Sequence, residues 1–175
     1  QGQARLRSMI ETRPDWCVSR QRVWGVPLPL FVSKKDGQPI RDINIINRIA
    51  DIYEKEGSDT WFTSDPKRFL GDKYSLDDYE QIQDVVEVWF DSGSTHAFCL
   101  EQRKDLKWPA SMYLEGSDQH RGWFHSSLLE SCGTRGRAPF ESILSHGFVV
   151  DGKGLKMSKS LGNIIAPEDI LKKYG

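Results

Sequence analysis

The stretch MYLEGSDQHRGWF, residues 112–124, decides the fold that the sequence predicts. Its start, Met112 to Glu115, indicates a strand, and the turn Gly116-Ser117-Asp118 leads into a helix expected between about Gln119 and Cys132. A further strand is expected over residues 143–150, interrupted by a His-Gly pair. A strand, a glycine turn, a helix and a strand in this order are typical of a doubly wound parallel sheet, so we expect an α/β fold.

The other elements expected from the sequence lie on both sides of this stretch. Residues 85–90 (VVEVWF) have the composition of a buried strand, and residues 30–32 that of a short strand. Asp42 can cap a helix that ends at Gly57, and Pro167 opens a last helix with acidic residues at the positive end of its dipole. Residues 58–84 are acidic and irregular, which favours a solvated segment.

Length and charge restrict the domain count and the partners. The 175 residues fit one domain, or one domain with an insertion, and a formal net charge of −1 argues against a generally basic nucleic-acid surface. Residues 1–30 carry five Arg against two acidic residues, whereas residues 31–84 carry eight Lys or Arg against twelve Asp or Glu. We therefore expect a polyanion to contact the first 25 residues and the 152–163 loop.

Cysteine usage and hydropathy indicate the compartment. The cysteines Cys17, Cys99 and Cys132 lie far apart, which predicts neither a zinc site nor a disulfide framework and fits a reducing compartment. We expect no protein-bound metal. The sequence shows no signal peptide and no apolar run of the roughly 18 residues that a membrane span needs, so we expect a soluble cytoplasmic protein. It opens on Gln-Gly-Gln-Ala and closes on Lys-Lys-Tyr-Gly, which favours a piece of a larger protein.

Residues 115–119 offer polar groups where open α/β sheets bind their ligands, at the carboxyl end of a strand. Gly116 would let a ligand approach the backbone, while Glu115, Asp118 and Gln119 offer acceptors and an amide suited to hydroxyls or an ammonium. On spacing alone, an N-terminal cap in which Asp118 satisfies helix amides is equally favoured.

Two pairs of residues are weaker candidates. Trp89 and Trp123 lie on the sheet side of predicted turns and could wall a small apolar pocket, although ordinary core tryptophans are the more frequent case. His146 and Gly147 also follow a strand, where a hydrogen-bonded turn residue is more frequent than a catalytic base.

The loop that contains Lys156 and Lys159 is the most informative for chemistry. Residues 152–163 hold three lysines, three glycines and no acidic residue. Lysines in such a loop can neutralise charge that develops on a departing phosphate, whereas composition alone favours a solvated turn. The string KMSKSLGN, residues 156–163, resembles the second signature of class I aminoacyl-tRNA synthetases, which shifts the balance towards function.

Four stretches together resemble the isoleucyl-tRNA synthetase family, in the order found in that family. They cover almost the whole chain apart from residues 33–84, and the valine and leucine enzymes share part of the first stretch and the lysine loop. The stretches are DWCVSRQRVWGVPLP (15–29), VWFDSGSTH (88–96), YLEGSDQHRGWF (113–124) and HGFVVDGKGLKMSKSLGN (146–163).

This resemblance implies that isoleucine and ATP, which carries Mg²⁺, condense to an enzyme-bound adenylate before the acyl group passes to tRNA(Ile). It further implies a monomeric parent protein. By motif, the loop lysines are catalytic, and the remaining candidates hold ATP, the adenylate or the isoleucine side chain. These assignments are Lys159 and Lys156 on the ATP phosphates; His146 and Gly147 near adenine and ribose; Glu115, Gly116, Asp118 and Gln119 on the adenylate; and Trp89 and Trp123 in the isoleucine pocket.

The resemblance also implies a division of the chain. Residues 1–30 correspond to the return from an editing insert, residues 31–84 to a smaller α+β connective insert, and residues 85–175 to the second half of a Rossmann-like nucleotide-binding fold. The family's first signature, His-Ile-Gly-His, is absent, so we expect the isolated chain to be inactive. The alternatives are a valyl- or leucyl-tRNA synthetase fragment and a non-catalytic nucleotide- or RNA-binding module.

Overall fold

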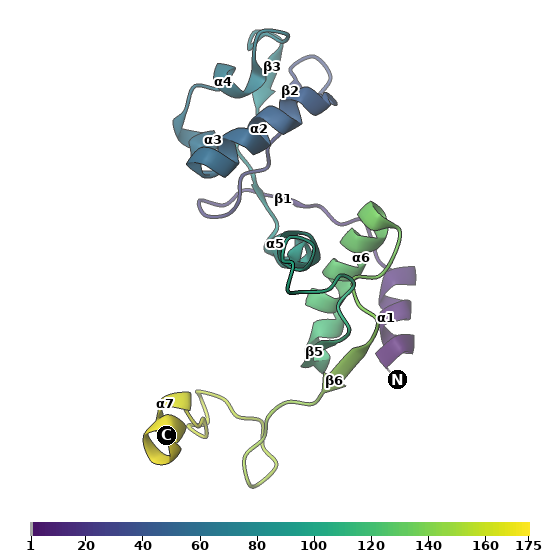
Figure 1. Cartoon of the computed structure of the whole chain (residues 1–175), viewed down its shortest axis with the longest axis vertical. Helices are drawn as coiled ribbons and strands as arrows, with labels where there is room; N and C mark the ends of the chain where they lie inside the picture. The colour runs from purple at the N-terminus through teal and green to yellow at the C-terminus, as the bar shows by residue number, and fades with distance from the viewer. Residues whose placement is uncertain (1) are drawn as a thin grey trace. The chain divides into compact units, whose positions relative to one another are not determined.

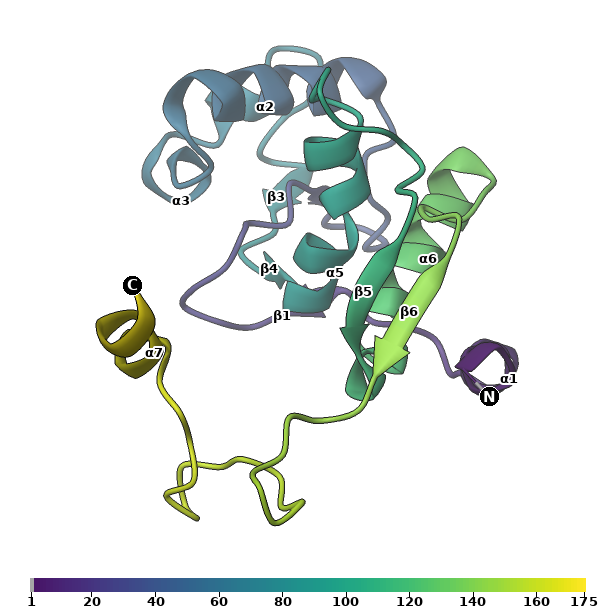
Figure 2. The ribbon, with the colours of Figure 1, turned by 60° about the horizontal axis from the view of Figure 1, so that its bottom comes forward.

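The computed structural model describes residues 2–175, which form two compact units. One unit comprises residues 2–13 and 95–175, and the other comprises residues 14–94. Most of the helices and strands of both are labelled in Figure 1, and Figure 2 shows the ribbon from a second direction. Within the described residues the strands form three sheets of two strands each.

The unit of residues 14–94 combines two antiparallel strand pairs with four helices. Strand β1 pairs with β4, and β2 pairs with β3 in the register Phe31↔Gln81. The predicted strand at residues 30–32 is confirmed as β2. The elements are β1 (Ser19–Arg20), β2 (Phe31–Ser33), α2 (Ile43–Glu56), α3 (Thr60–Thr63), α4 (Lys67–Leu70), β3 (Tyr79–Gln81), β4 (Val85–Val86) and α5 (Val88–Gly93).

Helix α2 has the boundaries that its sequence predicts. The Asp42 carboxylate accepts a hydrogen bond from the backbone N–H of Asn44 at 3.0 Å, which satisfies one of the free amides of the first turn. Gly57 ends the helix with φ of 86°, and its N–H donates to the Tyr53 carbonyl. Lys73 and the Asn44 amide stabilise the Asp42 carboxylate, so that its pKa falls to about 2.

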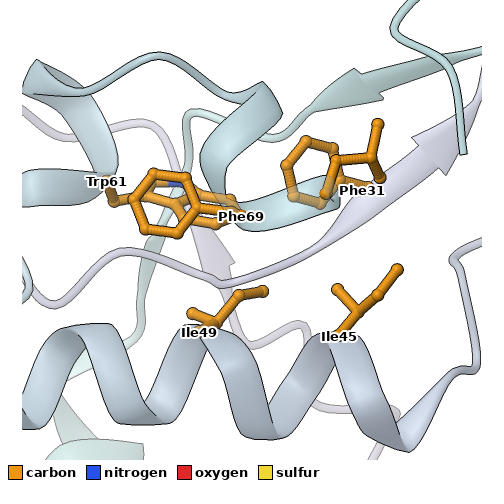
Figure 3. Close-up of a cluster of buried hydrophobic side chains, with 6 residues drawn as sticks. Phe31, Ile45, Ile49, Trp61 and Phe69 are labelled. Carbon is orange, nitrogen blue, oxygen red and sulfur yellow. The ribbon is translucent and has the colours of Figure 1, made fainter. Parts of the chain in front are cut away.

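The hydrophobic core of this unit contains the segment that composition assigns to solvent. Trp61, Phe69 and Leu70 are fully buried against Phe31 and helix α2, as Figure 3 shows for most of the cluster. The Trp61 ring packs 4.9 Å from Phe69, and its Nε1–H donates to the Ile82 carbonyl at 2.8 Å. The expectation of a solvated segment over residues 58–84 was therefore wrong, because a few large apolar side chains outweigh the acidic average.

The predicted strand over residues 85–90 was also wrong beyond its first two residues. Strand β4 ends at Val86, and the Glu87 carboxylate accepts from the Trp89 N–H at 3.2 Å, capping α5. The Val88, Trp89 and Phe90 side chains are exposed, so no sheet buries them. A local cap overrides the β propensity of this run.

The second unit contains a parallel strand pair with helices before and after it. Strands β5 and β6 pair from Tyr113↔Ile143 to Gly116↔His146, which confirms a parallel sheet. The predicted strand over residues 143–150 ends early, at His146. The elements are α1 (Gly2–Glu11), the π-helix η1 (His96–Leu100), β5 (Tyr113–Gly116), the 3₁₀ helix η2 (Ser117–His120), α6 (Trp123–Arg135), β6 (Ile143–His146) and α7 (Pro167–Tyr174).

Of two further predicted helices, one begins where expected and the other is divided. Helix α7 begins at Pro167 with Glu168 and Asp169 in its first turn, as expected. The helix expected over residues 119–132 is divided at Gly122 into η2 and α6.

None of the helices formed by residues 2–175 combines the length and apolar character that crossing a bilayer requires.

We predict that Ile49→Ala lowers the free energy of unfolding by about 2–5 kcal/mol, because it leaves a cavity in the core. Ile46 lies on the same helix but is 47% exposed, against 2% for Ile49. Ile46→Ala is therefore the matched control and should change the free energy of unfolding by at most about 0.5 kcal/mol. Urea unfolding followed by circular dichroism measures both, and equal losses would contradict this description of the core.

Candidate functional site at the ends of the parallel strands

The ends of β5 and β6 bring most of the predicted polar residues together. Gly116 and His146 form the last pair of the parallel register, so Glu115 and Gly147 lie at the same edge. Helix η2 starts directly after Gly116 and carries Asp118. Figure 2 shows the two strands side by side, pointing in the same direction. This is the edge at which open α/β sheets bind ligands.

Gly116 is required here by space rather than by backbone angles. Its φ of −66° and ψ of 159° suit any residue, but a Cβ would lie 2.6 Å from Asp118 Oδ1 and 3.8 Å from His146 Cε1. A side chain at this position would displace the Asp118 carboxylate. The glycine therefore lets the carboxylate fold back over the strand end.

Gln119, not Asp118, caps the helix that follows. The Gln119 Oε1 accepts from the Trp123 N–H at 2.9 Å, and η2 has no side-chain cap of its own. Gln119 Nε2 donates to Asp118 Oδ2 at 3.3 Å. The alternative in which Asp118 satisfies the helix amides was wrong, and the exposed Asp118 carboxylate stays available at the strand edge.

His146 has one ring nitrogen committed to the backbone. Its Nδ1 lies 2.7 Å from the Gly147 carbonyl, which can only accept, so Nδ1 carries the proton. In the neutral ring, Nε2 is then left as an acceptor. The residue is exposed, so a ligand at the strand edge could reach it.

The two candidate tryptophans have different surroundings. Trp123 is the first residue of α6 and stacks on Tyr113, with ring centroids 4.1 Å apart and an interplanar angle of 5°. Tyr113 is buried and pairs through its hydroxyl with Ser127 at 3.0 Å; burial raises the pKa of its hydroxyl. Trp89 lies on α5 in the other unit and is 42% exposed. Its expected place beside a sheet was wrong, because α5 replaces the strand.

The two signature lysines lie on the loop that follows β6. The Lys156 ammonium stands over the Phe148 ring, 3.7 Å from its centroid. Among residues 2–175, the Lys159 ammonium has no hydrogen bond and no ion pair, and the residue is exposed. The two cations are therefore unequal: one is held against an aromatic ring, and one is free to meet an anion.

The loop is organised by two residues to which the sequence reasoning gave no role. Asp151 and Asn163 hydrogen-bond to each other at 2.9 Å. Asn163 and the amides of Leu155 and Lys153 hold the pKa of the Asp151 carboxyl below its usual value. The sequence signal was Asp-Gly before the lysines and Gly-Asn after them, since both dipeptides favour turns.

Each unit contains a hollow that none of the predicted site residues lines. One groove of about 800 Å³ lies between α1 and the segment of residues 140–145, and none of the predicted site residues lines it. Another, of about 810 Å³, lies beside the exposed Val23-Trp24 turn in the other unit. Within residues 2–175, no three His, Cys, Asp or Glu residues are grouped to hold a metal ion.

The comparison with known families gives the class of protein. All 175 residues match the family described as tRNA synthetases class I (I, L, M and V). The chain belongs to this family.

Within the family, three curated relatives of high identity carry one name. The chain is 78% identical over 99% of its length to the isoleucine–tRNA ligase of Pelagibacter ubique, and 58% and 59% identical to those of Mesorhizobium japonicum and Brucella abortus. It spans only 19%, 17% and 18% of these relatives, about a fifth of each.

A solved structure supports the fold. The chain resembles a LeuRS from Agrobacterium radiobacter K84, solved in a ternary complex with tRNA and LeuAMS, with a TM-score of 0.60 and 23% identity. The match covers 93% of this chain and 23% of that one. The chain thus has the class I synthetase fold, with mixed helices and strands and a parallel sheet.

We predict that Gln119→Ala lowers the free energy of unfolding by about 0.5–2 kcal/mol, because α6 loses its N-terminal cap. Asp118→Ala is the matched control at the neighbouring position, where no helix amide is lost, and should cost clearly less. Thermal unfolding compares the two, and hydrogen exchange of the Trp123 amide reports the cap directly. A larger loss for Asp118→Ala would contradict the assignment of the cap to Gln119.

Proposed function

We propose that residues 1–175 are a segment of an isoleucine–tRNA ligase acting in the cytoplasm. The observation that carries the proposal is the 78% identity over 99% of this chain to the Pelagibacter ubique relative of that name. In the proposed reaction the isoleucine carboxylate attacks the α-phosphorus of ATP, the P–O bond to the β-phosphate breaks and pyrophosphate leaves. A hydroxyl at the 3′ end of tRNA then attacks the acyl carbon of the adenylate, the acyl–phosphate bond breaks and AMP leaves.

The strand edge suits the adenylate in this proposal. Exposed Glu115 and Asp118 carboxylates can accept hydrogen bonds from ribose hydroxyls or the amino group of isoleucine, and Gly116 leaves the space that the Asp118 carboxylate occupies at this edge. His146 Nε2 can accept from the nucleoside side of the ligand. Gln119 has its side-chain oxygen committed to α6 and one N–H of its side-chain amide directed at Asp118, so the second N–H of that amide is the part left for a ligand.

The loop lysines suit the leaving group. Negative charge grows on the pyrophosphate as the P–O bond breaks, and a cation placed there stabilises the transition state more than the bound substrates. Lys159 fits this role best because its ammonium has no partner among the described residues. Lys156 would assist from its place over the Phe148 ring. The Mg²⁺ that accompanies ATP would neutralise further phosphate charge.

The tryptophans would line the isoleucine side-chain pocket. For Trp123, one ring face is covered by Tyr113, so that face cannot meet a substrate. For Trp89, the exposed position on α5 leaves much of the indole accessible. Rigid aromatic surfaces of this kind suit a branched aliphatic side chain.

We propose the same division of the parent protein that the resemblance implies. Residues 85–175 would form the second half of a Rossmann-like domain, residues 31–84 a connective insert, and residues 1–30 the return from an editing insert. The pairing of β5 with β6 supports the first of these assignments. The isolated chain would then carry only part of the ATP site.

We predict that the full-length protein catalyses isoleucine-dependent exchange between pyrophosphate and ATP, whereas the 175-residue chain alone shows none above background. Exchange that depends on valine or leucine instead would favour a sister enzyme. Salt-sensitive tRNA binding without any amino-acid-dependent exchange in the full-length protein would favour an RNA-binding module. Robust exchange by the isolated chain would contradict its assignment as half a site.

We predict that Lys159→Ala in the full-length protein lowers the rate of adenylate formation by about 10²–10³-fold, the size of effect seen when a transition-state contact is removed. The Michaelis constant for isoleucine should change little. Lys153→Ala is the matched control, since Lys153 is an exposed lysine of the same loop. Equal losses in the rate and in isoleucine affinity would count against a transition-state role, as would equal effects of the two substitutions.

A further inference from the structure

Asp151 and Asn163 lie at opposite ends of the lysine loop, and a hydrogen bond between their side chains connects the two ends. Asn163 Nδ2 donates to Asp151 Oδ2 at 2.9 Å across twelve residues of chain. We call this pair the polar clasp. Both residues are partly buried, so the contact is shielded from water more than a bond on an open surface.

The Asp151 side of the clasp closes a tight hairpin. Its Oδ1 accepts from the backbone N–H groups of Lys153 and Leu155 at 2.9 and 3.0 Å. Its own N–H donates to the Leu155 carbonyl at 2.9 Å, and Gly154 supplies the φ of 77° that the turn needs. One carboxylate therefore fixes the backbone immediately before the first signature lysine.

The Asn163 side fixes the backbone between the two signature lysines. Its Oδ1 accepts from the Ser158 N–H at 2.9 Å, and its Nδ2 also approaches the Lys156 carbonyl at 3.4 Å. The amide thus uses both ends, one towards the loop backbone and one towards Asp151. The position of Ser158 determines where Lys159 begins.

The rest of the loop restrains Lys156 and leaves Lys159 projecting. Val150 and Lys156 form an antiparallel bridge, and the Met157 N–H donates to the Val149 carbonyl at 3.2 Å. Phe148 holds the Lys156 ammonium. The clasp therefore orders the backbone under both cations without occupying the ammonium of Lys159.

We infer that Asp151 and Asn163 are positioning residues, which preorganise Lys156 and Lys159 for the leaving pyrophosphate. This inference rests on the proposed adenylation. A cation stabilises a developing charge most when it needs no rearrangement during the reaction, and a loop of Gly, Ser and Lys would otherwise have to become ordered at each turnover. The clasp touches no substrate in this assignment; it acts through the lysines.

The first test exploits the opposite polarity of the two side chains. Asp151→Asn sets an amide against the amide of Asn163 or against the loop N–H groups, and Asn163→Asp sets two carboxylates together. The exchanged pair, Asp151→Asn with Asn163→Asp, restores a donor facing an acceptor. Hydrogen exchange of the Lys153, Leu155 and Ser158 amides in the 175-residue chain should accelerate in each single variant and return towards the original rates in the exchanged pair.

The second test measures pyrophosphate exchange in the full-length protein with the same variants. Each single substitution should lower kcat by about tenfold, in line with the loss of a hydrogen bond to a charged group. The Michaelis constant for isoleucine should stay within about twofold, because the clasp does not contact the amino acid. The exchanged pair should recover most of kcat, whereas adding Lys159→Ala to either single variant should cost less than it does in the unsubstituted protein.

The outcomes separate the clasp from the proposed function. Unchanged kcat in both single variants, in a full-length protein that is otherwise active, would overturn the positioning role even if the loop amides exchange faster. Full additivity with Lys159→Ala would also overturn it. Absence of isoleucine-dependent exchange in the unsubstituted full-length protein would overturn the proposed function itself, and the amide measurements on this chain would then report on the clasp alone.

Discussion

The parallel pairing of β5 with β6 is the constraint on which the candidate site depends. It places Gly116 opposite His146, so two loops that are distant in sequence leave the sheet at one edge. Tyr113 is buried on one face, whereas Leu114 and Leu144 are exposed on the other. A slip of one residue would exchange these faces and bury the wrong side chains. The register that keeps Tyr113 inside therefore also sets where the polar turn and the lysine loop begin.

The sequence predicted those elements of the fold whose signals are local. Asp42 and Gly57 bound α2 because a cap and a positive φ each need only the neighbouring backbone. The strand predicted from Val85 to Phe90 was too long, because strand propensity depends on a partner sheet. Beyond Val86 the Glu87 carboxylate caps a helix instead. The prediction of a solvated segment over residues 58–84 was wrong because the average charge of the segment gives no sign of Trp61. The burial of Trp61 depends on contacts from distant segments.

For the candidate site, the sequence identified the residues but not the role of each one. The motifs singled out Glu115 to Gln119 and the lysines, and the structure gathers the former at one strand edge. The hydrogen bonds assign these residues other roles than the sequence predicted. Gln119 accepts from the first amide of α6, and Asp118 is the residue left for a ligand. Asp151 and Asn163 were not assigned any role, because the direction of a side chain across twelve residues of loop depends on backbone geometry that no spacing rule gives.

The pairing of β1 with β4 has a consequence for how the unit of residues 14–94 relates to the rest of a chain. Ser19 and Val86 are opposite each other, and Pro27 bridges to Val85, so the point where the chain enters this unit adjoins the point where it leaves. The core around Trp61 is completed by residues that lie between these two points. Such a module can lengthen, shorten or vary during evolution while the pairing of β1 with β4 keeps the flanking sequence in place.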